Sequence, residues 1–203
     1  MLSISFGSGD PGWATIIQLT GLALTLITTA IAVHVARIAS KIRNLDWIKA
    51  QNDAWNAYNA LKLVDENIES FKAVDSLIMG RPVPDNLLDD YKIRAVLFSR
   101  MNIQERDFRA LLYKLIRNYD GFYLVDEIRA SVPNAARISS FLAGSGYDPM
   151  FVMFYRRVAR AFAHNSALTT GDLDVFPILK SIRVDHAAGR TNDHLALLPG
   201  EAI

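Results

Sequence analysis

The sequence predicts an all-α protein, with one N-terminal transmembrane helix continuing into a long amphipathic helix that packs in a four- or five-helix cytoplasmic bundle. Three observations predict this fold class. The run 14–33 holds twenty residues without a charge, and later stretches repeat apolar residues at spacings of three and four. The only β-like candidate, 122–125, is too short to build a sheet.

The uncharged run is long enough to cross a bilayer. At about 1.5 Å rise per residue it matches a hydrocarbon core of roughly 30 Å. A secretory signal peptide is the alternative, but the preceding residues contain Asp10 and no Lys or Arg, whereas a signal peptide begins with a basic region and has a shorter apolar segment. Ala30 and Ala32 resemble a cleavage site only weakly, so an uncleaved anchor is favoured.

Basic residues follow the run rather than precede it. Arg37, Lys41 and Arg43 lie downstream, against only Asp10 and the terminal amine upstream. The positive-inside rule therefore predicts a single-pass protein of the inner (plasma) membrane, with its N-terminus outside and its C-terminal domain in the cytoplasm. The three basic residues are also candidates for binding anionic membrane lipid at the cytoplasmic leaflet.

One face of the apolar run carries small and weakly polar residues. Gln18, Gly21, Thr25 and Thr28 recur at spacings of three and four. In lipid, such a stripe allows close helix approach and interhelical hydrogen bonds, which predicts a homo-oligomer or a partner helix. Threonines that bond their own backbone in a solitary anchor explain the stripe equally well, and the sequence leaves both readings open.

The first half of the domain is expected to form two long helices. No Gly or Pro occurs from Arg37 to Met79, which predicts one amphipathic helix continuing the transmembrane helix. The segment GRPVP ends it, and Asp85 is the expected N-cap of a second helix that runs to Asn118. The faces 55–78 and 98–116 are the expected main walls of the core.

Shorter helices follow these two. They are expected at 122–130, from Pro133 through Leu142, from Asp148-Pro149 to about His164, and from near Pro177 to before Gly189. The predicted organisation is then an extracytoplasmic tail, a transmembrane helix, a helical cytoplasmic domain and a flexible tail, at 1–12, 13–36, 37–188 and 189–203.

Composition excludes several classes of function. The chain has 22 Lys plus Arg against 21 Asp plus Glu, so no strong positive field recruits nucleic acid. The absence of cysteine excludes disulfides, thiolate zinc sites and cysteine nucleophiles. No motif indicates a catalytic residue, a cofactor or a metal site, and an enzyme is therefore the less favoured reading.

A few polar groups are weaker candidates for chemistry. Arg156, Arg157 and Arg160 could form an anion site, because a guanidinium group makes bidentate hydrogen bonds with two phosphate oxygens. Ion pairs on a solvated helix face explain these arginines more simply. Asp185-His186 and Asp193-His194 offer metal-type ligands that no motif orders. Four carboxylates could act as acid and base if folding brought them together: Glu105, Asp107, Asp126 and Glu127. Two asparagines are instead expected to lie buried between helices: Asn56 and Asn102.

The layout of residues 13 to about 165 resembles uncharacterised bacterial single-pass membrane proteins with a small all-helical cytosolic domain. The blocks that carry the resemblance are WNAYNALKLVDE, LFSRMNIQERDF and GYDPMFVMFYRRVAR. The resemblance implies the architecture and the membrane location of this chain, and it assigns no functional residue. The expected function is a membrane-anchored interaction protein, acting as scaffold, sensor or assembly subunit with an unknown protein partner. The alternative is a membrane-proximal enzyme acting on a phosphate-containing or lipid-derived substrate.

Overall fold

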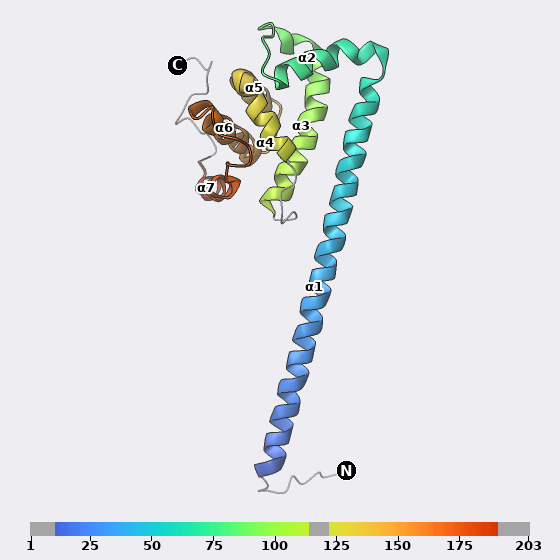
Figure 1. Ribbon diagram of the computed structural model, residues 1–203, viewed down its shortest axis with the longest axis vertical. Coiled ribbons are helices and arrows are strands. Elements are labelled where there is room, and N and C mark those ends of the chain that lie inside the picture. Colours follow the sequence, from blue (N-terminus) through green and yellow to red (C-terminus); the bar gives the residue numbers. More distant parts are fainter. Residues whose placement is uncertain (1–10, 114–121, 191–203) are drawn as a thin grey trace. The chain divides into compact units, whose positions relative to one another are not determined.

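The computed structural model describes residues 11–113 and 122–190. Within these ranges the chain forms seven α-helices and no strand, which confirms the all-α prediction (Figure 1). The chain divides into two compact units, Met1–Trp47 and Ile48–Ile203. Helix α1 spans Pro11–Lys62, so the second unit holds the last part of α1 together with six further helices, more than the four or five expected.

Helix α1 is long and apolar enough to cross a membrane, judged by its length and composition. After Gly21 it contains no Gly or Pro, so no residue of these types breaks the backbone hydrogen-bond ladder. Each large apolar side chain from Ile16 to Ile38 is at least 45% exposed. The first unit therefore has no apolar core among its described residues.

The prediction of one helix from 37 to 79 is wrong. Helix α1 ends at Lys62, a 3-10 turn covers Asp65–Asn67, and helix α2 spans Ile68–Ile78. The Asn67 side-chain amide donates to the Leu61 carbonyl at 3.2 Å, which satisfies one of the carbonyls that a helix end leaves without a partner. Because the chain turns here, α2 can bury its apolar face while Leu63 stays 83% exposed.

The predicted cap of the next helix is also wrong. After a 3-10 turn at Leu87–Asp89, helix α3 spans Tyr91–Leu112, and the Asp90 carboxylate accepts from the backbone N–H groups of Lys92 and Ile93 at 2.7 and 3.3 Å. Asp85 instead forms an ion pair with Arg137. The extra turn delays the helix by five residues. Helix α3 ends at Leu112, so the prediction that it continues to Asn118, a residue outside the described ranges, is wrong.

The shorter helices lie close to where they are predicted. Helices α4, α5, α6 and α7 span Phe122–Ala130, Ala135–Gly144, Pro149–His164 and Val175–Ala187. Asp148 caps α6 by accepting from the Met150 N–H at 2.8 Å, with Pro149 in the first helical position, as the sequence predicts. Helix α7 begins two residues before Pro177 because Asp174 caps it.

Helix α6 is central to the core of the second unit. It contacts α4, α5 and α7, and Figure 1 shows it between α5 and α7. Phe151, Phe154 and Val158 of α6 are completely buried. Helices α2 and α3 contribute to the same core as expected, but Tyr58 of α1 and Phe71 of α2 form a separate small cluster with Ile103. The main wall is therefore α6, which sequence analysis did not single out.

Gly80 allows a close approach between the end of α2 and the end of α4. Its φ angle is +65°, a left-handed conformation that glycine adopts without strain. A Cβ atom here would clash with the Ala130 carbonyl oxygen and lie 2.9 Å from Cδ of Pro133. The Asn134 side chain joins the same two segments by donating to the Leu77 and Arg81 carbonyls at 2.9 and 3.0 Å.

Candidate functional site

A chain of charged and polar side chains connects four helices of the second unit. Arg100 of α3 lies at its centre, with Nη1 2.7 Å from Asp75 Oδ1 of α2 and Nη2 2.5 Å from Glu127 Oε1 of α4. Asp75 also binds Lys62 Nζ of α1 at 2.7 Å, and the Gln104 side-chain amide donates to Glu127. We call these five residues the Arg100 network.

Arg100 is buried and fully committed to its partners. Its side chain is 9% exposed, and its Nε also donates to Glu127 Oε2 at 3.3 Å, which makes the pair bidentate. Burial acts to lower the pKa of the guanidinium. The charge and hydrogen bonds of Glu127, with a further contribution from Tyr58, outweigh this effect, so the pKa is raised. A buried pair of this kind fixes geometry more than it adds stability, because desolvation offsets much of the attraction.

Asp107 lies one helical turn beyond Gln104 and is only 8% exposed. Burial raises its pKa to about 7, the nearby Glu127 carboxylate adds to the rise, and Arg106 and Gln51 oppose it. The side-chain oxygens of Gln51 and Gln104 are buried and lack a hydrogen-bond partner among the described residues. Near neutral pH this carboxyl group therefore exchanges a proton, and its protonated form is a hydrogen-bond donor in a region rich in acceptors.

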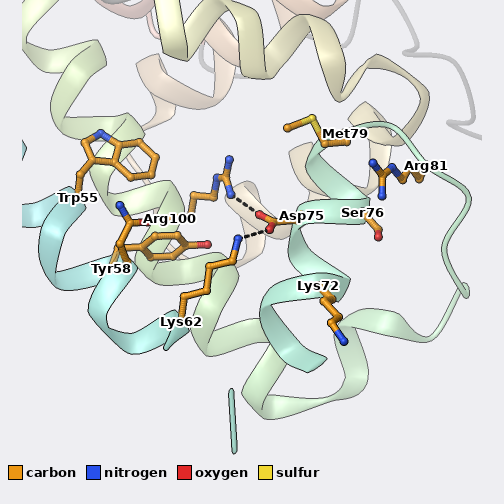
Figure 2. A pocket seen from close by; sticks show the side chains of 10 residues that line it. Trp55, Tyr58, Lys62, Lys72, Asp75, Ser76, Met79, Arg81 and Arg100 are labelled. Atoms are coloured by element: carbon orange, nitrogen blue, oxygen red, sulfur yellow. Dashed lines mark hydrogen bonds and ion pairs between the residues drawn. The ribbon is translucent and has the colours of Figure 1, made fainter. Parts of the chain in front are cut away.

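A pocket of about 620 Å³ adjoins the Arg100 network, a volume typical of small-molecule sites (Figure 2). Trp55 and Tyr58 form an aromatic wall on α1, and the Arg100 guanidinium lies 5.8 Å from each ring centroid. The lining consists of Trp55, Tyr58, Asn59, Lys62, Lys72, Asp75, Ser76, Met79, Arg81 and Arg100. Figure 2 shows Asp75 held between Lys62 and Arg100.

The Tyr58 hydroxyl is a buried polar group in the lining of the pocket. Tyr58 is 3% exposed, and its ring is held by Phe71 and Trp55 at centroid distances of 4.9 and 5.7 Å. The neighbouring Arg100 guanidinium can only donate to its oxygen, so the hydroxyl proton has no acceptor among the described residues. Leaving such a group unsatisfied costs about 1–3 kcal/mol. Burial raises the pKa of Tyr58, although Arg100 acts in the opposite direction, so the hydroxyl is a neutral donor at physiological pH.

The residues predicted for helix association all lie on an exposed part of α1. The Thr25 and Thr28 hydroxyls donate to the carbonyls of Gly21 and Leu24 at 2.8 and 2.7 Å, so each satisfies its own backbone. Gln18 and Gly21 are exposed, and nothing lies within 4 Å of the Cβ position of Gly21. The local bonds agree with the simpler reading of the threonines, and association stays a prediction.

The predicted basic sites are distributed over both units. Arg37, Lys41 and Arg43 are exposed on α1. On α6, Arg156 donates to Ser139 of α5, while Arg157 binds Ser181 and Asp185 of α7, each at 2.6 Å. Arg160 lies on α6 one turn before the helix ends and is half-buried. Arg156 and Arg157 therefore join neighbouring helices.

The candidate carboxylates are separated by the fold. Only Asp107 and Glu127 belong to one polar region, whereas Glu105 binds Arg109 and accepts from the Asp148 N–H, and Asp126 is exposed. Asn56 and Asn102 are exposed, so the expectation that they are buried is wrong. The buried amides are Gln51 and Gln104, because the junction of α1 with α3 faces those positions.

Asp185, one of the metal-type ligands in the sequence, forms ion pairs with two arginine side chains. It pairs with Arg157 and Arg190 at 2.6 and 2.7 Å. The described ranges contain no group of three His, Asp or Glu side chains that could hold a metal ion. Asp193 and His194 lie outside those ranges, as does most of the tail predicted at 189–203.

Sequence analysis missed the Arg100 network, but one pattern in α3 indicates it. Arg100, Gln104 and Asp107 recur at spacings of four and three beside the apolar residues Met101 and Phe108, so they line one helical face. Polar residues at core spacing predict a buried polar cluster. Their partners Asp75 and Glu127 come from other helices, and no local pattern identifies them.

No protein-family model, curated protein or solved structure matches this chain at a significant level. The likeness to bacterial single-pass membrane proteins therefore stays an expectation. Its candidate site combines paired charges, an aromatic wall and one buried hydroxyl donor. Such an arrangement is suited to holding a polar ligand in a fixed orientation.

Proposed function

We propose that the protein is a membrane-anchored helical interaction protein, a scaffold, sensor or assembly subunit with its domain 37–188 in the cytoplasm. The observation that supports the anchor is the exposure of eleven large apolar side chains between Ile16 and Ile38. At roughly 1 kcal/mol for each half-exposed side chain, leaving them in water costs on the order of 10 kcal/mol. A bilayer removes that cost, and the 13–36 segment is long enough to span it.

The second unit has the properties of a folded domain that presents surfaces to partners. Its core is packed around α6, and several of its charged groups pair between helices. The basic residues Arg37, Lys41 and Arg43 favour a cytoplasmic side for this domain and contact with anionic lipid there. A scaffold or sensor needs only a rigid domain and an accessible site.

Topology is tested with reporters fused before Met1 and after Ile203 in the full chain. A cytoplasmic reporter is expected to be active only at the C-terminal end, and the protein should stay in the membrane fraction after a carbonate wash. The mass of the purified protein should include residues 1–33, which a cleaved signal peptide would remove. Activity of a periplasmic reporter after Ile203 would show that the orientation is wrong.

Self-association through the stripe of Gln18, Gly21, Thr25 and Thr28 is the second part of the proposal. Gly21→Leu combined with Thr25→Leu should reduce crosslinked oligomers in native membranes, because bulky side chains keep the helices apart. The matched control is Leu22→Ala with Leu26→Ala on another face of the helix. Oligomers that survive the first pair of changes would exclude this stripe as the interface.

The alternative function is a membrane-proximal enzyme acting on a phosphate-containing or lipid-derived substrate. The observation that favours it is the polar pocket, where Lys62 and Arg100 meet the Asp75 carboxylate. Phosphorus NMR of a soluble phosphate ester incubated with the full-length protein separates the two functions. Slow release of inorganic phosphate that Asp75→Asn abolishes would support the enzyme, whereas an unchanged ester supports a binding role.

A further inference from the structure

The pocket beside the Arg100 network contains a donor that the described part of the chain does not use. The Tyr58 hydroxyl is buried and its proton has no acceptor among the described residues, since Arg100 can only donate to it, and Figure 2 shows it pointing into the pocket towards Lys62 and Asp75. Buried polar atoms are nearly always hydrogen-bonded to protein, to ordered water or to a ligand. The hydroxyl therefore indicates an occupant that accepts a hydrogen bond.

The charges around the pocket favour an anionic occupant. The lining carries four cationic side chains and one carboxylate, and two further carboxylates, Glu69 and Glu127, pair with lining residues. Four cations against three carboxylates leave a positive surplus. The pair of Lys72 with Glu69 is fully on the surface and contributes little, so Lys72 and the exposed Arg81 remain accessible at the rim.

The arrangement also shows which groups can contact the occupant. Arg100 already binds Asp75 and Glu127, and its guanidinium lies near the rings of Trp55 and Tyr58. Arg100 therefore positions the aromatic wall. Lys62 is half-exposed and shares Asp75, so its ammonium group has hydrogens left to donate. Phosphate oxygens accept from ammonium, guanidinium and hydroxyl groups alike.

We propose that this pocket binds a phosphate group, with the Tyr58 hydroxyl and the Lys62 ammonium as its inner donors and Lys72 and Arg81 at its rim. This inference names the ligand class of the pocket that the alternative function also uses, but it requires only binding and depends neither on a reaction nor on the topology of the membrane segment. The phosphate can belong to a small soluble ester or to a lipid headgroup, since the recognising chemistry is the same for both.

The test uses the full-length protein in nanodiscs, with thermal unfolding and calorimetric titration as readouts. Inorganic phosphate and glycerol phosphate are the probes in discs of zwitterionic lipid, and phosphatidic acid in the disc replaces them in a second arm. Tyr58→Phe keeps the ring and removes only the hydroxyl. Lys62→Gln removes the positive charge of the inner donor. The control is Lys180→Gln, at an exposed position of α7.

Binding is expected to weaken about tenfold in Tyr58→Phe and in Lys62→Gln, which corresponds to about 1.4 kcal/mol, and to stay unchanged in Lys180→Gln. Without ligand, Tyr58→Phe should unfold at the same or a higher temperature, because it removes an unsatisfied buried group. A response only to glycerol phosphate identifies a soluble ligand, and a response only to phosphatidic acid identifies a headgroup.

Two results would overturn the proposal. No response to any probe excludes a phosphate site, and equal affinity in Tyr58→Phe excludes the hydroxyl as a donor to it. A lower unfolding temperature of ligand-free Tyr58→Phe, with no phosphate response in the parent protein, would show that the hydroxyl holds a bound water only. Because none of these readouts depends on orientation, failure here leaves the proposed anchor intact.

Discussion

Replacing Asp107 by Asn should stabilise the protein at pH 8 and leave it nearly unchanged at pH 4. The substitution keeps the size of the side chain and removes only its ability to ionise. Like the protonated carboxyl group of Asp107, the Asn amide can donate next to the unsatisfied oxygens of Gln51 and Gln104. The effect should therefore come from the charge of this one buried carboxylate.

The magnitude follows from the pKa of Asp107, which rises from 3.8 to about 7 on folding because of burial and the neighbouring Glu127. Between these pH values the folded state holds a proton that the unfolded state has released, so stability decreases as pH rises and the loss is complete above pH 7. A pKa difference of about three units corresponds to a loss of at most about 4 kcal/mol in the free energy of unfolding. For a domain of this size, that is an upper limit of roughly 16 °C in unfolding temperature.

The assay is thermal unfolding of the full-length protein in neutral detergent, followed by circular dichroism from pH 4 to pH 8. The advantage of Asp107→Asn over the parent should grow steadily with pH and level off above pH 7. Asp126→Asn, an exposed position on α4, is the control and should show no such trend. An advantage that does not change with pH, or a variant less stable than the parent at pH 8, would refute the reasoning.

Two further pairs of substitutions test the fold. Gly80→Ala should lower the free energy of unfolding by at least about 2 kcal/mol, because the new Cβ meets the Ala130 carbonyl oxygen and φ is positive. The control is Gly144→Ala, where the Cβ position is open, and it should be neutral or stabilising by up to about 1 kcal/mol. Urea unfolding measures both variants. Asp90→Ala should lower the free energy of unfolding by about 1 kcal/mol, because Asp90 caps α3, and Asp85→Ala should lower it by less than about 0.5 kcal/mol. Hydrogen exchange of the α3 amides measures both effects. An equal loss of protection in the two variants would contradict the assignment of the cap.

Local signals predict the short helices well. Asp148-Pro149 is sufficient to place the start of α6, because a capping carboxylate and a first-turn proline act within a few residues. The same rule fails at Asp85. Six residues, 85–90, include four that are Asn or Asp, and several of them are competent caps. Only the 3-10 turn that precedes α3 selects Asp90.

Long-range contacts decide where α1 ends and which polar residues are buried. The segment 37–79 has helical periodicity throughout, so its pattern alone predicts no break. The break at 63–67 allows α2 to bury Val74 and Leu77 in the core, a gain that depends on partners remote in sequence. For the same reason Gln51 and Gln104 are buried where Asn56 and Asn102 were expected.

By itself, the sequence determined that the chain is helical, that its N-terminal run is apolar and long enough to cross a membrane, and where most short helices begin. These properties depend on composition, periodicity and capping, which act over a few residues. Tertiary structure alone decided the candidate site. Lys62, Asp75, Arg100 and Glu127 lie on four helices, and the charge balance, the burial of Tyr58 and the shifted pKa of Asp107 exist only once those helices meet.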